Sequence, residues 1–170
     1  VINAAATKPF GFTPFYPGPG LGGHCIPIDP FYLTWKAKEF GLTTKFIELT
    51  GEINANMPSW VVSKVADTLN DLGKSISKSK ILVLGVAYKK NVGDLRESPA
   101  IEIIEILIKK GANIEYSDPF VTDLKAIKNS NFNTNSIDLT EQSIANKDVV
   151  IITTDHDQFD LEFVQQNTLT

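Results

Sequence analysis

The residues with the clearest chemical potential lie in one stretch, PGPGLGGHCIPIDP, which runs from Pro17 to Pro30. It holds four glycines, four prolines, one of the two histidines and the only cysteine of the chain. So many glycines and prolines exclude a helix interior or a central strand, and they predict a shaped loop. A lone thiol at the end of such a loop indicates a nucleophile that is delivered to a bound substrate.

Cys25 has two interpretations, because a free cysteine is often an inert and buried small residue. Here it precedes Asp29 and Pro30, which are a good N-cap and a good first residue of a helix. The partial positive charge at such a helix start favours the thiolate, so we interpret Cys25 as reactive. Asp29 acts as the N-cap, or it orients a water molecule or a lysine. Too few ligands are present for a metal site, and His24 is not assigned as a base because adjacent side chains point apart.

Three cations, Lys89, Lys90 and Arg96, follow a buried apolar run in a chain whose net charge is −4. Loops at the carboxyl ends of parallel strands bind ligands, and phosphate suits a group of cations beside a helix start. Simple solvation is the better interpretation for Lys90. The sequence GVAYKK in this loop is not a dinucleotide-binding fingerprint.

Two helical stretches must position the cysteine loop. The first is expected from Pro30 until Gly41, and its apolar residues share one face: Leu33, Ala37 and Phe40. The second covers residues 44–73, and Gly51 and Pro58 predict that it is divided into two segments. Its apolar stripe consists of Val61, Val62, Val65, Ala66, Leu69 and Leu72. It serves as a connector or subunit interface, or as an ordinary core helix.

The residues before the loop predict a last helical turn over 1–7 and then an aromatic stretch. We interpret its rings as core residues more readily than as the lining of a pocket for a flat ligand: Phe10, Phe12, Phe15 and Tyr16.

Three short apolar runs, 81–87, 113–117 and 148–154, predict strands that are buried in a parallel sheet. Ser98 and Pro99 start the helix between the first two, with a buried face at Ile101, Ile104, Leu107 and Ile108. This pattern is a βαβ unit of the doubly wound type, which requires further strands that the sequence does not contain.

The polar segments define the organisation of the chain. Residues 74–80 (KSISKSK) are interpreted as the boundary between two units. A short helix is expected over 140–145, and residues 165–170 form no clear element. Because the chain also starts at Val1 without a methionine, we expect it to be a piece of a longer protein.

Composition limits the class of protein. The chain has 170 residues, of which 42% are hydrophobic and 21% are charged, as in globular proteins. A net charge of −4 and the lack of a long apolar run give no reason to expect nucleic acid or a membrane as a partner. A single cysteine fits the reducing cytoplasm, and a thiol redox protein would need a second, resolving cysteine.

Two motifs together, PGPGLGGHCIPIDPFYL and LVLGVAYKKNVGDLRESP, closely resemble the UDP-glucose/GDP-mannose dehydrogenase family. Members combine an N-terminal NAD-binding Rossmann domain, a central helical dimerisation domain and a C-terminal Rossmann-like domain that binds UDP. The resemblance implies that residues 1–74 hold the catalytic loop and part of the all-α central domain. Residues 75–170 would then be an incomplete UDP-binding domain of the α/β class, and the NAD domain lies outside this sequence.

The resemblance also implies roles by position. Cys25 matches the catalytic nucleophile, and Asp29 matches the residue that assists thioester hydrolysis. Tyr88 and Lys89 match contacts to the UDP-sugar. The loop before the cysteine matches the segment that wraps the nucleotide sugar through its backbone: Phe15, Tyr16, Pro17, Gly18, Pro19, Gly20, Leu21 and Gly22.

Further roles concern NAD and a partner subunit. Arg96 matches an arginine that faces the NAD side of the cleft, and the backbone from Cys25 through Ile26 and Pro27 to Ile28 is expected on that side as well. Lys8 lies near the point where family members send a basic residue into the partner's site, and a homodimer through the central domain is implied. No metal is expected.

The implied reaction is the four-electron oxidation of C6 of a sugar to a carboxylate, with two NAD⁺ and a thioester on Cys25, for envelope polysaccharide synthesis. Ile28 stands before Asp29 where glucose-specific members have a Lys-Asp pair. This is similar to members that act on UDP-N-acetylhexosamines, with UDP-N-acetylglucosamine favoured over UDP-N-acetylmannosamine. The alternative is that the chain alone is a UDP-sugar-binding and dimerisation module without turnover.

Overall fold

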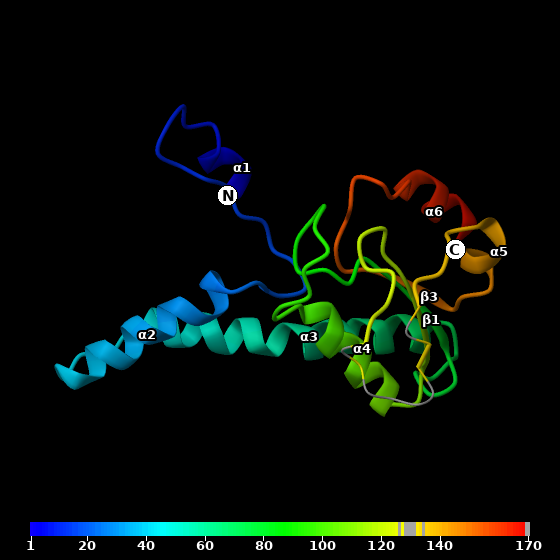
Figure 1. The fold of residues 1–170 in the computed structure, drawn as a ribbon, viewed down its shortest axis with the longest axis horizontal. Helices are drawn as coiled ribbons and strands as arrows, with labels where there is room; N and C mark the ends of the chain where they lie inside the picture. The colour runs from blue at the N-terminus through cyan, green and yellow to red at the C-terminus, as the bar shows by residue number, and fades with distance from the viewer. Residues whose placement is uncertain (126, 128–131, 134, 169–170) are drawn as a thin grey trace.

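The computed structural model describes residues 1–125, 127, 132–133 and 135–168 of the chain. Two long helices reach away from a unit that combines helices and strands (Figure 1). The helices are α1 (Ile2–Ala5), α2 (Cys25–Glu39), α3 (Lys45–Asp71), α4 (Pro99–Lys109), α5 (Glu141–Ala145) and α6 (Leu161–Asn167). The strands are β1 (Lys80–Leu84), β2 (Asn113–Ser117) and β3 (Val149–Ile152).

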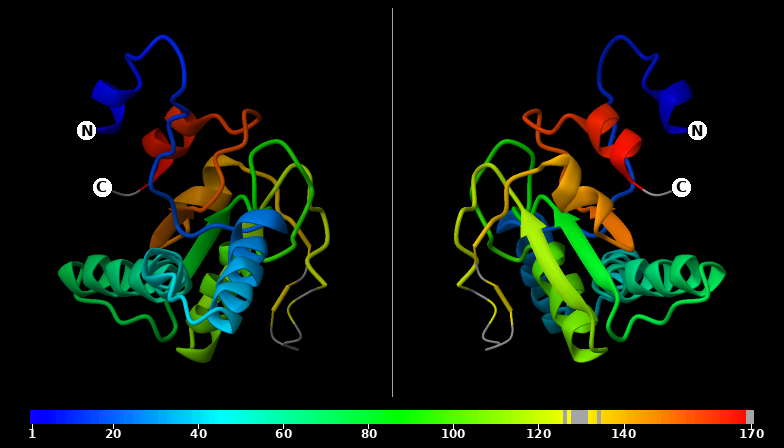
Figure 2. Two further views of the ribbon diagram at one scale, coloured as in Figure 1. Left: turned by 90° about the vertical axis from the view of Figure 1, so that its left-hand side faces the viewer. Right: turned by 90° about the vertical axis from the view of Figure 1, so that its right-hand side faces the viewer.

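The described strands form a parallel sheet in the order β2-β1-β3. Lys80 pairs with Asn113 and Ile81 with Val149, and the arrows of β1 and β2 lie side by side in Figure 2. The predictions of a parallel sheet and of a βαβ unit are therefore confirmed. Ser98 and Pro99 start α4 as predicted, because proline suits the first turn of a helix.

Side chains of β1 alternate between two cores. Ile81 and Val83 lie in a large core with the buried residues of α3 and α4. Leu82 and Leu84 lie in a second core with Ile144 of α5. The sheet is therefore covered on both faces, and its carboxyl edge is left for the loops that follow the strands.

The helix α3 is one element of 27 residues, so the prediction of two segments is wrong. Gly51 lies inside α3, and a Cβ at this position would clash with the ring of Phe31 from α2. Only glycine leaves room for that ring. Pro58 also lies inside and is buried, which means that packing compensates for the backbone hydrogen bond that proline cannot donate. Val65 and Leu69 of the predicted stripe are buried, but Leu72 is exposed.

The helix α2 begins at Cys25 with His24 as its N-cap, so the prediction that Asp29 is the N-cap is wrong. Pro27 occupies the third position of the helix, where a backbone N–H has no partner within the helix, and the helix can therefore start one turn earlier. The stop at Gly41 is confirmed, since this residue has a φ of 71°.

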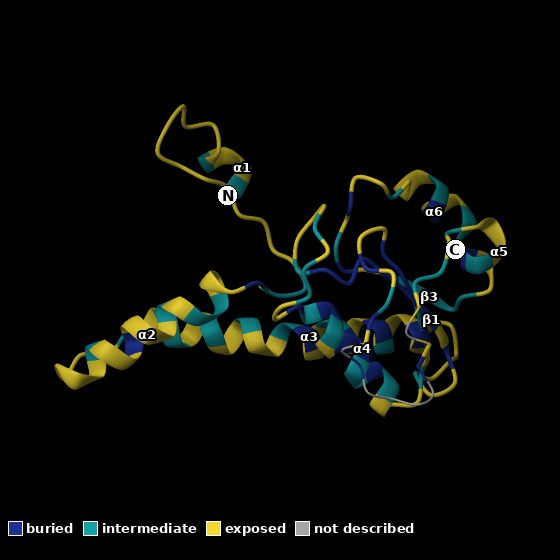
Figure 3. Cartoon of the chain, in the orientation of Figure 1, coloured by how far each residue is buried: buried dark blue, intermediate teal, exposed yellow. Residues whose placement is uncertain are grey.

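Many residues of α2, of the first half of α3 and of the N-terminal segment are exposed (Figure 3), and several of them have large apolar side chains. Leu33 and Phe40 of the expected buried face are 60% and 72% exposed. Phe15 and Tyr16 are 72% and 64% exposed, so the interpretation of the aromatic stretch as core is wrong for this chain. In the N-terminal segment, the Tyr16 hydroxyl donates to Asn3 Oδ1 at 2.9 Å.

The C-terminal part contains one helix that the sequence did not indicate, α6, whose N-cap Asp160 accepts a hydrogen bond from the backbone N–H of Phe163. The expected helix near residue 140 is confirmed as α5, with a capping box between Thr140 and Ser143. None of the helices within the described part of the chain has both the length and the apolar content needed to cross a bilayer.

Gly85 ends β1 with a φ of 74°, and a Cβ there would meet the carbonyl oxygen of Thr154. Gly73 has a φ of 67° but no atom within 4 Å of such a Cβ. We expect Gly73→Ala to lower the free energy of unfolding by about 1–2 kcal/mol, from backbone strain alone. Gly85→Ala should lower it by about 3 kcal/mol or more, because the clash adds to the strain. Urea denaturation measures both, and equal losses would contradict the packing at Gly85.

Candidate functional site

The glycine loop docks on the segment that follows β1. The backbone N–H of Gly23 donates to the carbonyl oxygen of Arg96 at 2.9 Å. A Cβ at Gly22 would lie 2.6 Å from the carbonyl oxygen of Glu97 and 2.6 Å from Cβ of Tyr88. The two motifs singled out in the sequence are therefore in backbone contact. Only glycine, which has no Cβ, allows the two segments to approach each other this closely.

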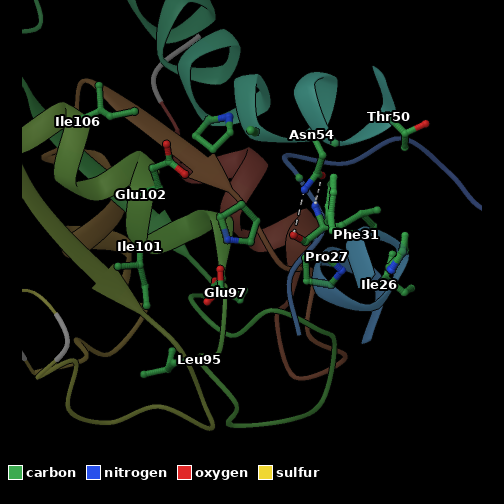
Figure 4. Close-up of a pocket in the computed structure, with 18 of the residues that line it drawn as sticks. Ile26, Pro27, Phe31, Thr50, Asn54, Leu95, Glu97, Ile101, Glu102 and Ile106 are labelled. Atoms are coloured by element: carbon green, nitrogen blue, oxygen red, sulfur yellow. Dashed lines mark hydrogen bonds between the residues drawn. The ribbon is translucent and has the colours of Figure 1, made fainter. Parts of the chain in front are cut away.

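Asn54 of α3 holds the same loop from the other side. The backbone N–H of Leu21 donates to Asn54 Oδ1 at 2.6 Å, and Asn54 Nδ2 donates to the carbonyl oxygen of Leu21 at 3.4 Å (Figure 4). A side-chain amide that pairs with both polar groups of one residue fixes that residue's backbone. The loop is thus fixed on both sides just before the cysteine.

Cys25 is exposed and is the first residue of α2. The first N–H groups of a helix have no partner within the helix, so the backbone around Cys25 offers free donors. Asp29 is exposed and follows four residues later in the same helix, so the two side chains share one face. The structure therefore keeps the predicted pair together, although Asp29 does not cap the helix.

Arg96 brings a fixed positive charge to this region. Its Nε and Nη2 donate to the carboxylate of Asp94 at 3.0 and 2.7 Å. The hydrogen bonds with Asp94 are the largest cause that raises the pKa of Arg96, and the charge of that carboxylate raises it further. The same pair lowers the pKa of Asp94. Asp94 therefore orients the guanidinium group of Arg96, and the carbonyl oxygen of Arg96 holds the glycine loop two residues before the thiol.

The loop after β1 carries the other predicted substrate contacts. Tyr88 is half-buried, and its backbone N–H donates to the carbonyl oxygen of Asp94 at 2.9 Å. Lys89 is exposed. Lys90 forms an ion pair with Asp157 at 2.7 Å, so its charge is partly compensated.

A pocket of about 970 Å³ lies between α2, α3 and α4, beside the glycine loop (Figure 4). Phe31, Asn54 and Glu102 contribute to its lining, together with Ile26 and Pro27 of the predicted NAD-side segment. Cys25 and Asp29 are not part of the lining, so this pocket is adjacent to the thiol and does not contain it.

The N-terminal part of the predicted site lies apart from the thiol region. Lys8 is exposed, as are the side chains from Phe15 to Gly18. Their segment leads away from α2 and α3 toward α1 (Figure 1). The structure thus brings together the residues from Gly20 to Asp29 with Tyr88 and Arg96, and it leaves Lys8, Phe15 and Tyr16 outside this group.

Two sequence profiles match the chain. The UDP-binding domain of the UDP-glucose/GDP-mannose dehydrogenase family matches residues 82–168, and the central domain of that family matches residues 1–56. The chain belongs to the UDP-glucose/GDP-mannose dehydrogenase family. The resemblance noted in the two sequence motifs is thereby confirmed, while the division at residues 74 and 75 stays a prediction.

Individual members of the family support the same assignment. The chain is 38% identical to a UDP-N-acetyl-D-mannosamine dehydrogenase of Methanococcus maripaludis over 84% of its own length and 30% of the relative's length. It is 31% identical to a UDP-N-acetyl-D-glucosamine 6-dehydrogenase of Salmonella typhi over 94% of its own length and 36% of the relative's length. The chain thus spans about a third of the length of these relatives.

A solved UDP-D-ManNAc dehydrogenase of Pyrococcus horikoshii has the same arrangement of elements. It superimposes with a TM-score of 0.77 at 28% identity, over 98% of this chain and 37% of the solved one. The fold class predicted for this family member is therefore confirmed.

Asn54 and Asp94 are two contributors to the site that the sequence did not reveal. Asn54 acts on Leu21, which is 33 positions away, and a polar residue on a helix gives no signal of that contact. Asp94 stands two residues before Arg96, and this short spacing in a loop was the available signal.

Proposed function

We propose that this chain is part of an NAD-dependent dehydrogenase that oxidises C6 of a UDP-N-acetylhexosamine to a carboxylate. The observation that carries the proposal is the position of Cys25 at the start of α2, two residues after Gly23, whose backbone N–H donates to the carbonyl oxygen of Arg96 at 2.9 Å. Membership of the dehydrogenase family supports it.

The proposed chemistry balances over four electrons. The alcohol loses a hydride and a proton to become an aldehyde, to which the Cys25 thiol adds as a thiohemiacetal. Loss of a second hydride and proton gives a thioester on Sγ. Water then cleaves the C–S bond, which releases the carboxylate and the thiol. Sulfur suits this sequence because a thioester forms readily and still hydrolyses.

Two molecules of NAD⁺, one for each oxidation, would accept the two hydrides. Arg96 fits the diphosphate of this cofactor, because the guanidinium is exposed, permanently charged and oriented by Asp94. The segment from Cys25 to Ile28 fits the same side, because a helix start offers free backbone N–H groups. Asp29 holds a position from which it can orient the water that hydrolyses the thioester.

The loops flanking the thiol are proposed to bind the UDP-sugar. Tyr88 offers a half-buried ring and Lys89 an exposed charge that suits a phosphate. The segment from Phe15 to Gly22 wraps the sugar through its backbone, and Lys8 acts in the partner's site. The exposed state of these last residues fits groups that become buried only with substrate or with a second subunit.

The epimer at C2 is the finer part of the proposal. The glycine loop favours a UDP-N-acetylhexosamine, and the run FYLTWKAKEFGL that follows it favours UDP-N-acetylglucosamine. The relatives include enzymes named for either epimer, at 38% and 31% identity. A panel of UDP-sugars on the full-length enzyme, followed through NADH, tests this. The preferred substrate should yield two NADH per sugar, and UDP-glucose should be oxidised more slowly.

A homodimer is proposed through α2 and α3. Their exposed aromatic side chains form an apolar surface of the kind that interfaces cover: Phe31, Tyr32, Trp35, Phe40, Phe46 and Trp60. The cytoplasm is the proposed location, because a lone reactive thiol such as Cys25 requires a reducing compartment.

A second candidate is that the chain by itself binds UDP without turnover. The match of residues 82–168 to the UDP-binding domain favours it. Calorimetry of the chain with UDP is expected to show binding in the millimolar range or tighter. Lys89→Ala should weaken it about fivefold, the value of one exposed charge contact. Lys64→Ala, which removes a comparable exposed lysine from α3, should leave it unchanged. No heat at millimolar UDP would contradict the UDP-binding role.

A further inference from the structure

Three loops at the carboxyl edge of the sheet meet at one buried pair, Asp118 and His156. Asp118 directly follows β2, and His156 lies in the loop after β3. Both side chains are completely buried. We propose that this pair positions Tyr88 and Lys89, in the loop after β1, for binding of the UDP-sugar. The inference rests on the proposed function and adds two positioning residues to it.

Asp118 gathers backbone donors from two of the loops. Its Oδ2 accepts hydrogen bonds from the N–H groups of Val86 at 2.7 Å and Ala87 at 3.2 Å. Its Oδ1 accepts from the N–H groups of Phe120 at 2.8 Å and Val121 at 3.0 Å. A buried carboxylate with such partners is satisfied, and it fixes the backbone that supplies them. The residue directly before Tyr88 is therefore held in place.

His156 holds the other end of the same segment. Its Nδ1 accepts a hydrogen bond from the backbone N–H of Asn91 at 2.9 Å, so the ring proton resides on Nε2. Nε2 then donates to Asp118 Oδ2 at 3.1 Å. The rings of Phe120 and Phe159 flank the imidazole, with centroids at 5.0 and 5.6 Å. One side chain thus connects the loops after β1, β2 and β3.

The next contacts reinforce this end of the loop. Asn91 Nδ2 donates to Asp157 Oδ2 at 2.6 Å, and the backbone N–H of Asp157 donates to Asn91 Oδ1 at 3.1 Å. Asn91 has a φ of 61°, a left-handed conformation that needs support in any residue but glycine. Lys90 pairs with Asp157 at 2.7 Å and with Asp155 at 3.6 Å.

Tyr88 and Lys89 therefore lie between two fixed points, Ala87 and Asn91. The bonds of Asp118 and His156 to this segment go to loop backbone and not to a helix or strand. Apolar side chains in place of this pair would leave the N–H groups of the loop backbone without their acceptors, so the pair determines the course of that backbone. Its place at the carboxyl edge of the sheet, with donors from the predicted contact loop, points to a role in positioning that loop.

His156→Gln separates positioning from packing. A glutamine amide can still donate to Asp118 from the place of Nε2, but it offers no acceptor at the place of Nδ1, so only the bond to Asn91 is lost. Phe159→Leu is the matched control, because it removes packing from the same ring and no hydrogen bond. Thermal denaturation shows how far each variant is destabilised.

The readouts are UDP affinity by calorimetry and amide hydrogen exchange of the chain. We expect His156→Gln to weaken UDP binding about tenfold. It should also accelerate amide hydrogen exchange at Asn91, while the exchange rates in β1 stay unchanged. Phe159→Leu should lose as much thermal stability as His156→Gln, but its UDP affinity should stay within about twofold of that of the unmodified chain. Unchanged UDP affinity in His156→Gln, or equal weakening in both variants, would overturn the inference. Absence of UDP binding in the unmodified chain would instead contradict the proposed UDP-binding role of residues 82–168, and the inference with it.

Discussion

Cys25→Ser in the full-length enzyme is expected to abolish formation of the uronic acid. The serine hydroxyl is a far weaker nucleophile than a thiol at neutral pH, and an oxygen ester would hydrolyse more slowly than a thioester. The loss of turnover should be about 1,000-fold or more. Mass spectrometry of the sugar product and NADH absorbance measure it.

The UDP-sugar should still bind to this variant, because Cys25 is exposed at the start of α2 and supports no packing. Thr68→Ser, on an exposed turn of α3, is the control and should keep full activity. Intact-mass analysis of the unmodified enzyme, quenched during turnover, should reveal a sugar adduct on Cys25. Full activity of Cys25→Ser would contradict the role of Cys25 as the nucleophile.

Gly22→Ala should displace the cysteine loop from the segment after β1. The new Cβ would lie 2.6 Å from the carbonyl oxygen of Glu97 and from Cβ of Tyr88, and neither atom is the end of a flexible side chain. Since a shift of about 1 Å in a reacting group costs about 100-fold in rate, we expect a loss of that size in the full-length enzyme. NADH production with the preferred UDP-sugar measures it.

Gly41→Ala is the matched control for this change. Gly41 has a φ of 71° but nothing within 4 Å of an added Cβ, so its replacement strains the backbone without a clash. It should lower thermal stability and leave the rate per folded molecule unchanged. If Gly22→Ala kept the normal rate, the close contact between the two motifs would not matter for catalysis.

Local chemistry explains which elements the sequence predicted. Ser98 and Pro99 start α4, Gly41 ends α2, and the apolar run of β1 is buried on both faces, as the residue types require. Each of these sequence signals depends only on residues that are close together in the chain. The sequence therefore identified the strands, their parallel direction and the starts of α4 and α5, whereas the order β2-β1-β3 comes from the structure.

Tertiary contacts explain the errors. Pro58 would break an isolated helix, but burial keeps it within α3. Phe40 and Phe15 have apolar side chains that the sequence assigns to a core, and no partner in the described part of the chain covers them. Prediction from one sequence cannot distinguish a core face from a face that belongs to an interface.

The candidate site was predicted where a motif carried it. The glycine loop before Cys25 contacts Tyr88 and Arg96, which lie 63 and 71 positions after that cysteine in the second motif. Asn54 and His156 were missed because they act through backbone groups far away in the sequence. The rule that functional residues follow parallel strands was the one signal that could have drawn attention to His156.

The continuity of α3 has a mechanical consequence. Asn54 near its middle holds the loop of the nucleophile, while Leu69 near its end is fixed in the core beneath the sheet. At a rise of about 1.5 Å per residue, these anchors are about 22 Å apart on one stiff rod. Cys25 and the sheet of the UDP-binding domain are therefore expected to move as one unit in any domain motion of the full-length protein.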